Sequence, residues 1–286
     1  MDLTNINEIK TLLSRHGFRF SKSKGQNFLT AAWVPEDIAD AAGPDGQTGV
    51  LEIGPGIGCL TEQLSERAGK VVSVELDTAL RPVLAETLAG RNNVEIVYGD
   101  ALKLNIPKLL DEKMPGMRHV VCANLPYNVT GPVISKLLKC RCFDSVTVMI
   151  QREVAHRICA RPGTGEYGEF TVFVNWYARP EMLFDVPPDC FIPQPKVTSS
   201  VIRLDCRVSP PVEVKSEAMF MRVVRAAFAQ RRKTLLNALS TGFGELSKDE
   251  VEKCLLDSGF DPKVRGEVLS IGEFAKIADA FFTVLD

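Results

Sequence analysis

The sequence predicts an α/β fold in which a doubly wound, mostly parallel sheet is followed by a small all-helical C-terminal domain. From Val50 to about Cys206, short apolar runs alternate with helical patterns, as they do in sheets built from strand–helix–strand units. Polar residues follow several of these runs, at the points where strands should end. Beyond residue 212, apolar residues recur only at helical spacing.

The elements before the sheet can be assigned from their end signals. Asn5-Ile6-Asn7-Glu8 matches a capping box that opens a short helix, and this helix should stop near Gly17. Residues 22–29 then form a basic loop. A second short helix should run from Pro35 to Ala42, closed by Gly43.

The first predicted strand of the sheet, Val50–Ile53, runs into three glycines, Gly54, Gly56 and Gly58, and then into a helix. Glycines at such a turn permit positive φ and close backbone approach, and helix N–H groups favour the polar end of a ligand. The spacing is Gly-x-Gly-x-Gly, whereas the dinucleotide fingerprint is Gly-x-Gly-x-x-Gly. Alone, the loop is compatible with a nucleotide-type ligand or with a plain tight turn.

Two further apolar runs lead to carboxylates. The strand from Lys70 ends at Glu75, about twenty residues beyond the glycines, where ribose hydroxyls lie in such folds. The run from Val94 places Asp100 at the next strand end, where an acid can accept a hydrogen bond from an adenine amino group. Each acid alone is also compatible with a solvated loop. Because the carboxyl ends of parallel strands meet at one edge, the set predicts a ligand crevice there.

A polar-Pro-aromatic turn, Asn124-Leu125-Pro126-Tyr127, follows the apolar run 119–123. Asn124 offers a side-chain carbonyl. Pro126 biases Leu125 toward an extended conformation, so that neighbouring carbonyls can point outward. Tyr127 offers a face for stacking. Two acceptors and one aromatic plane suit the exocyclic amine of adenine, although a proline-terminated strand with an ordinary loop is the alternative.

Composition limits the classes of protein that remain. The chain has 286 residues, 45% hydrophobic and 24% charged, enough for one large or two unequal domains. No apolar run approaches the roughly 18 residues of a membrane span, and no signal peptide is recognisable, so we expect a cytoplasmic protein. Eight cysteines without a Cys-x-x-Cys pair, and three scattered histidines, predict reduced core thiols and no metal site.

Charge is unevenly distributed along the chain. The net charge is −2, yet residues 1–25 carry +3 and residues 215–235 carry +5, which leaves −10 on the rest. This distribution predicts a basic surface for nucleic-acid phosphates. A solvated helix face is the alternative for any one residue. The candidate residues for binding nucleic acid are Lys22, Lys24, Arg222, Arg225, Arg231, Arg232 and Lys233.

With these motifs, the chain resembles the class I methyltransferases that use S-adenosylmethionine and, among them, the ribosomal RNA adenine N6,N6-dimethyltransferase family. The resemblance covers nearly the whole chain. Besides the glycine loop and Asn124–Tyr127, it rests on four long segments, which are Lys24–Leu29, Gln151–Arg157, Phe191–Val201 and Phe228–Asn237.

The resemblance implies a Rossmann-like methyltransferase sheet whose last strands, near 171–177 and 198–206, form a late hairpin-like pair. We therefore expect an N-terminal helix and basic loop (1–25), a cofactor-binding catalytic domain (26–208) and a helical RNA-recognition domain (212–286), with Ser209-Pro210-Pro211 as a linker. The expected helical segments of the last domain are Met219–Phe228, Thr234–Leu239, Glu250–Leu256 and Phe274–Phe282.

The resemblance also implies roles for individual residues. The cofactor S-adenosylmethionine would contact Asn27, Leu29, Gly54, Gly56, Glu75, Asp100 and Asn124. Asn124 and a carbonyl of the Leu125-Pro126 turn would accept the target amino hydrogens, while Tyr127 and Phe191 would stack on the flipped-out base. Phe28 is expected to pack. The substrate implied is a pair of adjacent adenosines in the 3′-terminal stem-loop of 16S rRNA, in a pre-30S particle, and the enzyme is expected to be a monomer.

Three alternatives remain from the sequence. An NAD-dependent oxidoreductase explains the glycine loop and Glu75 but not Asn124–Tyr127. A DNA adenine or large-subunit rRNA methyltransferase shares the target clamp, by which we mean the Asn124–Tyr127 turn that suits an adenine amine. Such an enzyme differs in its target domain. A non-catalytic RNA-binding assembly factor would not need the intact motifs.

Overall fold

The computed structural model describes residues 1–18 and 26–286, and these form two compact units. The first comprises Met1–Ala155 and Ala178–Cys206, and the second comprises His156–Tyr177 and Arg207–Asp286. Residues 156–177 therefore pack with the C-terminal helices, whereas the sequence prediction assigned them to the sheet domain. The candidate residues Lys22 and Lys24 lie outside the described residues.

The first unit is built on a seven-stranded sheet in the order β4-β3-β2-β5-β6-β9-β7. Strands β4, β3, β2, β5 and β6 are parallel, while β9 runs antiparallel to both of its neighbours. The strands are β2 (Thr48–Ile53), β3 (Lys70–Glu75), β4 (Val94–Tyr98), β5 (Arg118–Asn124), β6 (Ser145–Gln151), β7 (Ala178–Val186) and β9 (Ser199–Cys206). Because the chain moves outward from β2 to β4 and then returns to β5, the sheet changes direction between β2 and β5, where a ligand crevice is expected.

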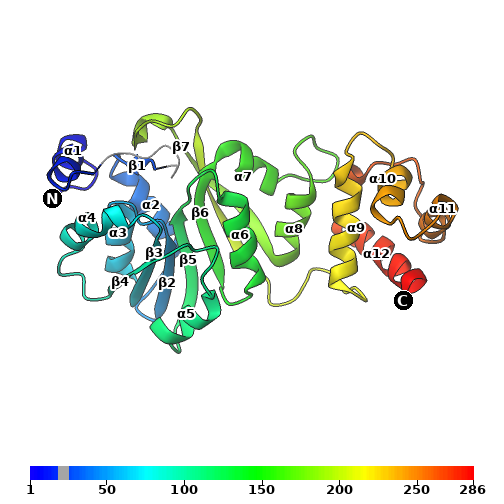
Figure 1. Cartoon of the computed structure of the whole chain (residues 1–286), viewed down its shortest axis with the longest axis horizontal. Helices are drawn as coiled ribbons and strands as arrows, with labels where there is room; N and C mark the ends of the chain where they lie inside the picture. Colours follow the sequence, from blue (N-terminus) through cyan, green and yellow to red (C-terminus); the bar gives the residue numbers. More distant parts are fainter. Residues whose placement is uncertain (19–25) are drawn as a thin grey trace. The chain divides into compact units, whose positions relative to one another are not determined.

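Helices cover the sheet of this unit (Figure 1). They are α1 (Ile6–Arg15), α2 (Trp33–Ala42), α3 (Cys59–Arg67), α4 (Arg81–Thr87), α5 (Ile106–Lys113), α6 (Thr130–Lys139) and the start of α7 (Arg152–Ile158). The short strands β1 (Phe28–Leu29) and β8 (Phe191–Ile192) pair separately from the main sheet. The central strands β2 and β6 are buried along nearly their whole length, as expected for parallel strands covered on both faces.

The predicted helix ends are largely confirmed. Asn5 caps α1 by accepting hydrogen bonds from the N–H groups of Asn7 and Glu8. The reciprocal half of the capping box is wrong, because Glu8 accepts from the N–H of Asp2 instead. Gly43 closes α2 in the left-handed conformation, with a φ of 60°.

The second unit is helical and contains α8 (Glu169–Tyr177), α9 (Glu217–Ala229), α10 (Leu235–Gly242), α11 (Lys248–Asp257) and α12 (Ile271–Leu285). The four predicted helical segments of this region are confirmed. None of the helices in the described part of the chain is long and apolar enough to cross a bilayer.

The strand predicted near 171–177 is wrong, because these residues form α8. Their Val, Phe and Trp content favours a strand by propensity, but tertiary packing prevails. The Trp176 ring stacks on Phe220 with centroids 4.1 Å apart, and the buried Thr171 hydroxyl donates to the Arg157 carbonyl at 2.6 Å. The antiparallel partner of β9 is instead β7, which begins at Ala178.

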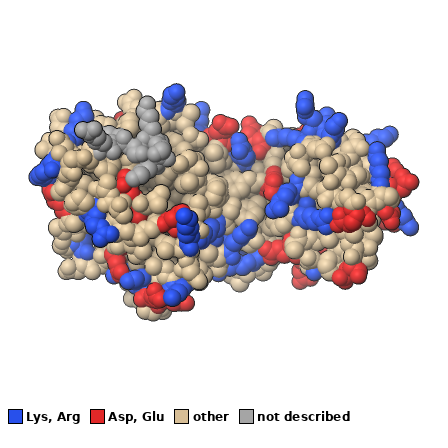
Figure 2. All heavy atoms as spheres, in the orientation of Figure 1, with Lys and Arg blue, Asp and Glu red and all other residues tan. Residues whose placement is uncertain are grey.

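Lys and Arg side chains are interspersed with Asp and Glu on the visible face of each unit (Figure 2). A Lys or Arg in the sequence is therefore not necessarily available to bind a phosphate, because an acidic neighbour can pair with it.

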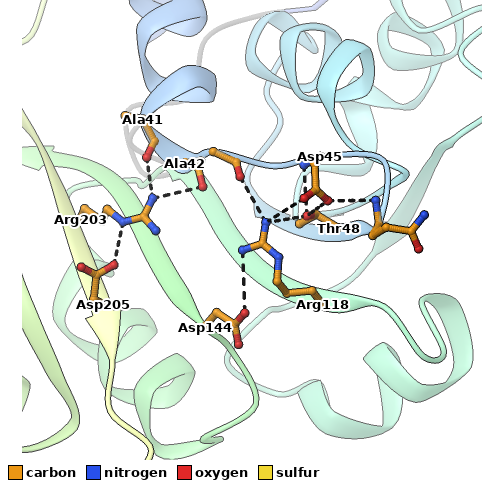
Figure 3. Close-up of polar contacts among 10 residues, drawn as sticks. Ala41, Ala42, Asp45, Thr48, Arg118, Asp144, Arg203 and Asp205 are labelled. Carbon is orange, nitrogen blue, oxygen red and sulfur yellow. Dashed lines mark hydrogen bonds and ion pairs between the residues drawn. The ribbon is translucent and has the colours of Figure 1, made fainter.

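Two arginines fix the edge of the sheet where the strands begin (Figure 3). Arg203 donates to the Ala41 and Ala42 carbonyls at 2.7 and 3.2 Å, and so satisfies the C-terminal end of α2. Arg118 donates to the Thr48 hydroxyl at 2.8 Å. These bonds anchor α2 and the start of β2, which leaves the opposite edge, at the strand carboxyl ends, for a ligand.

Candidate active site

A cavity lies at the carboxyl ends of β2, β3, β4 and β5. It brings together residues from the amino-terminal segment, the glycine loop, the two acidic strand ends and the Asn124 turn. Of the predicted site residues, its lining includes Asn27, Leu29, Gly54, Gly56, Glu75, Asp100, Asn124, Leu125, Pro126 and Tyr127. The crevice predicted from the strand ends is therefore present.

The glycine turn supplies one wall. Gly54 and Gly56 adopt φ values of 73° and 59°, which side-chain-bearing residues rarely adopt. A Cβ atom on Gly56 would lie 3.1 Å from the ring of Phe28. Phe28 thus packs on the turn, as predicted, and it also lines the cavity.

Glu75 provides a buried acceptor in this wall. Its Oε1 accepts a hydrogen bond from the Asp77 N–H at 2.6 Å, and burial raises the pKa of the carboxyl group. A buried carboxylate at the end of β3 is also suited to accept hydrogen bonds from the two hydroxyls of a ribose. This arrangement fits the adenosyl part of S-adenosylmethionine.

A Glu75→Ala variant should bind S-adenosylmethionine more weakly by about 1–3 kcal/mol, the usual cost of losing a charged hydrogen-bond partner. Calorimetry on the purified protein measures this directly. Glu66→Ala, at an exposed position on α3, is the matched control. Unchanged affinity in Glu75→Ala would remove Glu75 from the cofactor site.

Asp100 is the second acceptor. Its Oδ1 accepts from the Leu102 N–H at 2.9 Å, which fixes the carboxylate within a tight turn. An amine on a flat ring could be bound through Oδ2, whose nearest cation is the Lys103 ammonium at 3.8 Å.

The turn after β5 carries two further acceptors. The side-chain Nδ2 of Asn124 donates to the Asn27 carbonyl at 3.4 Å, which leaves Oδ1 for a ligand. The Pro126 carbonyl already accepts from the Val129 N–H at 3.1 Å, whereas the Leu125 carbonyl receives no hydrogen bond from any described residue. Of the two carbonyls that the sequence left open, Leu125 is therefore the acceptor available for an amine.

Tyr127 is held by a residue that sequence reasoning missed. Its hydroxyl lies 2.6 Å from the buried hydroxyl of Ser199 on β9. Burial raises the pKa of Tyr127, partly opposed by this hydrogen bond, so the ring stays neutral. Ser199 lies 72 residues away in sequence, and no local pattern marks it.

Glu52 was also missed. It is 1% exposed, lines the cavity, and accepts hydrogen bonds from the hydroxyls of Thr61 and Ser73 at 2.7 and 2.6 Å. Burial raises its pKa to about 7. The available signal was a carboxylate inside an otherwise apolar strand, Val50–Ile53.

Leu76, which directly follows Glu75, is a third omission. It lines the cavity and is 61% exposed, as an apolar platform for a planar ring would be.

Phe191 is not among the residues that line the cavity. It is 2% exposed, belongs to the hydrophobic core and pairs with Leu29 between β8 and β1. This position supports a packing role for Phe191, and its stacking on a target base stays a prediction.

The basic residues of the helical unit differ in their partners. Arg222 forms an ion pair with Glu245 at 2.6 Å and lies over the Phe243 ring, while Arg225 lies 3.5 Å from Glu169. Arg231 donates to the carbonyls of Gly165 and Tyr167 and pairs with Glu267.

Arg232 and Lys233 contrast with these three residues. Both side chains are exposed, and neither side chain forms a hydrogen bond or ion pair with the described residues. Among the members of the predicted set that the structure describes, these two have a charge available for phosphate.

We expect a double variant, Arg232→Ala with Lys233→Ala, to weaken rRNA binding and to reduce the slope of log K against log salt concentration by roughly 1–2. Its melting temperature should match that of the parent protein. Arg231→Met should instead lose about 1 kcal/mol of stability, because two carbonyls lose a charged donor. Binding at several salt concentrations and thermal unfolding measure both effects; an unaltered salt slope in the double variant would contradict the assignment.

In the described ranges, no three His, Cys, Asp or Glu side chains are grouped so that they could hold a metal ion, and all eight cysteines are free thiols.

Comparison with known proteins decides the family. The model of the ribosomal RNA adenine dimethylase family matches residues 17–281. The chain belongs to this family. It is an S-adenosylmethionine-dependent rRNA methyltransferase, and its cavity brings together the hydrogen-bond acceptors of Glu75, Asp100 and Asn124.

The matches to curated relatives of this dimethylase cover nearly the whole chain. Ribosomal RNA small subunit methyltransferase A of Geobacillus thermodenitrificans is 47% identical over 283 residues, covering 98% of this chain and 97% of the relative. The enzyme of the same name from Clostridium botulinum is 47% identical over 277 residues, covering 96% and 99%.

Two solved structures share the fold of this dimethylase at 26% identity. A dimethyladenosine transferase from Plasmodium falciparum gives a TM-score of 0.72 and covers 87% of this chain and 95% of its own. The 23S rRNA methyltransferase ErmE gives 0.66, covering 88% and 98%. The Rossmann-like methyltransferase fold predicted from the sequence is confirmed.

Proposed function

We propose that this chain transfers methyl groups to the N6 amines of two adjacent adenosines in the 3′-terminal stem-loop of 16S rRNA, giving N6,N6-dimethyladenosine. It acts as a monomer on a pre-30S particle in the cytoplasm. The small-subunit substrate is supported by relatives at 47% identity that carry the name small subunit methyltransferase A.

The observation that carries the reaction is that acceptors for two different adenines line one cavity. Asp100 and Glu75 suit the adenosine of the cofactor, and Asn124 with the Leu125 carbonyl suits the target amine. S-adenosylmethionine supplies an activated methyl group on a sulfonium sulfur.

The protein contributes alignment. An adenine amino nitrogen is a weak nucleophile because its lone pair is delocalised into the ring. The Oδ1 atom of Asn124 and the Leu125 carbonyl would accept both amino hydrogens, which favours a pyramidal nitrogen with its lone pair directed at the methyl group. Tyr127, held through Ser199, would stack on the extruded base and offset its lost stacking in the RNA. The proton can then leave to solvent.

A direct assay tests the proposal. The purified protein is incubated with labelled S-adenosylmethionine and unmethylated 30S particles, and the rRNA is digested to identify the modified nucleoside. Dimethyladenosine at two adjacent positions of 16S rRNA is the expected product. Label in 50S precursors or duplex DNA, with none in 30S particles, would favour a related methyltransferase instead, and no transfer to any substrate would favour an assembly factor.

A further inference from the structure

Lys136 on α6 connects this helix to the loop that carries Asp100. Its Nζ donates to the Leu102 carbonyl at 2.7 Å and to the Leu104 carbonyl at 2.6 Å. An ammonium group has three donors and forms strong, charge-assisted bonds with carbonyls. The proposed reaction does not use Lys136, and its partly buried position leaves it pointing at the loop.

The loop transmits this contact to Asp100. The N–H of Leu102 donates to Asp100 Oδ1 at 2.9 Å, and the N–H of Leu104 donates to the Asp100 backbone carbonyl at 3.1 Å. The two residues whose carbonyls bind Lys136 therefore also hold Asp100 through their N–H groups, Leu102 at its carboxylate and Leu104 at its backbone carbonyl. Displacing these peptides moves the acceptor.

The other end of α6 contacts the target clamp. The buried Thr130 hydroxyl, in the first turn of the helix, lies 3.3 Å from the Pro126 carbonyl and 3.4 Å from the Tyr127 carbonyl. From Thr130 to Lys136 a helix rises only about 9 Å. One short helix thus contacts both the loop predicted to bind the cofactor adenine and the turn predicted to bind the target adenine.

We infer that Lys136 is a positioning residue that holds Asp100 against the adenine amine of the cofactor. Helix α6 sets the distance between Asp100 and the target clamp. This inference rests on the proposed function, in which Asp100 accepts that amine. A lysine with only a structural role would stabilise the unit without any preference for an amine on the bound purine.

The test compares two ligands that differ at the amine. S-adenosylhomocysteine carries it, whereas S-inosylhomocysteine has a carbonyl oxygen in its place. In Lys136→Met, the Kd for S-adenosylhomocysteine should rise roughly five- to tenfold, as expected when a charged hydrogen-bond anchor is lost. The Kd for S-inosylhomocysteine should change by less than about twofold, since Asp100 makes no hydrogen bond with a carbonyl. Lys136→Arg keeps a positive charge that can donate to both the Leu102 and the Leu104 carbonyl, so it should restore discrimination between the two ligands.

Two controls separate the possible failures. Lys108→Met, on the exposed face of α5, should leave both affinities unchanged. Asp100→Ala should abolish discrimination; if it does not, the cofactor assignment of Asp100 fails. If Asp100→Ala abolishes discrimination while Lys136→Met preserves it, or weakens both ligands equally, the role of Lys136 is overturned and the proposed function stands.

Discussion

Replacing Asn124 with Ala should lower kcat by on the order of 100- to 1000-fold, as the loss of one preorganised hydrogen-bonding group at a reacting centre commonly does. The Asn124 amide is oriented before any substrate arrives, because its Nδ2 donates to the Asn27 carbonyl. The Leu125 carbonyl alone cannot accept both amino hydrogens, so the target nitrogen loses its alignment with the methyl group.

The measurement is single-turnover methylation of unmethylated 30S particles, together with calorimetry for S-adenosylmethionine. Cofactor binding should be largely retained, since the six other expected contacts, Glu75 and Asp100 among them, are untouched. Asn92→Ala, at an exposed loop position before β4, serves as the matched control. Turnover in Asn124→Ala equal to that of the parent protein would refute the clamp.

The sequence allowed the strand-end residues to be predicted because their arrangement follows from local rules. Glu75, Asp100 and Asn124 each end an apolar run, and parallel strands necessarily bring such ends to one edge. Their convergence on one cavity required no knowledge of distant contacts.

The residues that were missed depend on contacts between distant segments. Ser199 reaches Tyr127 across 72 positions, and Lys136 reaches Leu102 across 34, with no periodicity or composition to mark either pair. The sequence likewise does not distinguish adjacent basic residues whose partners differ. Arg231 is bound to the carbonyls of Gly165 and Tyr167, whereas Arg232, the next residue, is not. The strand predicted near 171–177 was wrong for a related reason. Trp176 packs on Phe220 and stabilises a helix where propensity favours a strand.

Glu52 predicts a pH dependence of folding stability. Burial raises its pKa to about 7 in the folded protein from an ordinary value of 4.5. Below pH 4.5 the carboxyl group is protonated in both states and carries no penalty. Between pH 4.5 and 7 the unfolded chain releases the proton while the folded protein retains it, so stability falls as pH rises. The loss should total about 3 kcal/mol and be complete above pH 7, at 1.36 kcal/mol for each unit of pKa shift.

Urea unfolding at pH 5, 6, 7 and 8 isolates this term when the parent protein is compared with Glu52→Gln. The amide has no charge to lose, and its oxygen can still accept from Thr61 and Ser73. The unfolding free energy of the parent protein minus that of Glu52→Gln should therefore fall from pH 5 to pH 7 and then level off. Glu95→Gln is the control of opposite sign, because a hydrogen bond from Lys113 lowers the pKa of Glu95 and its contribution is lost only in acid. A parallel pair of curves for the parent and Glu52→Gln would mean that Glu52 remains ionised in the fold, with Thr61 and Ser73 offsetting its burial.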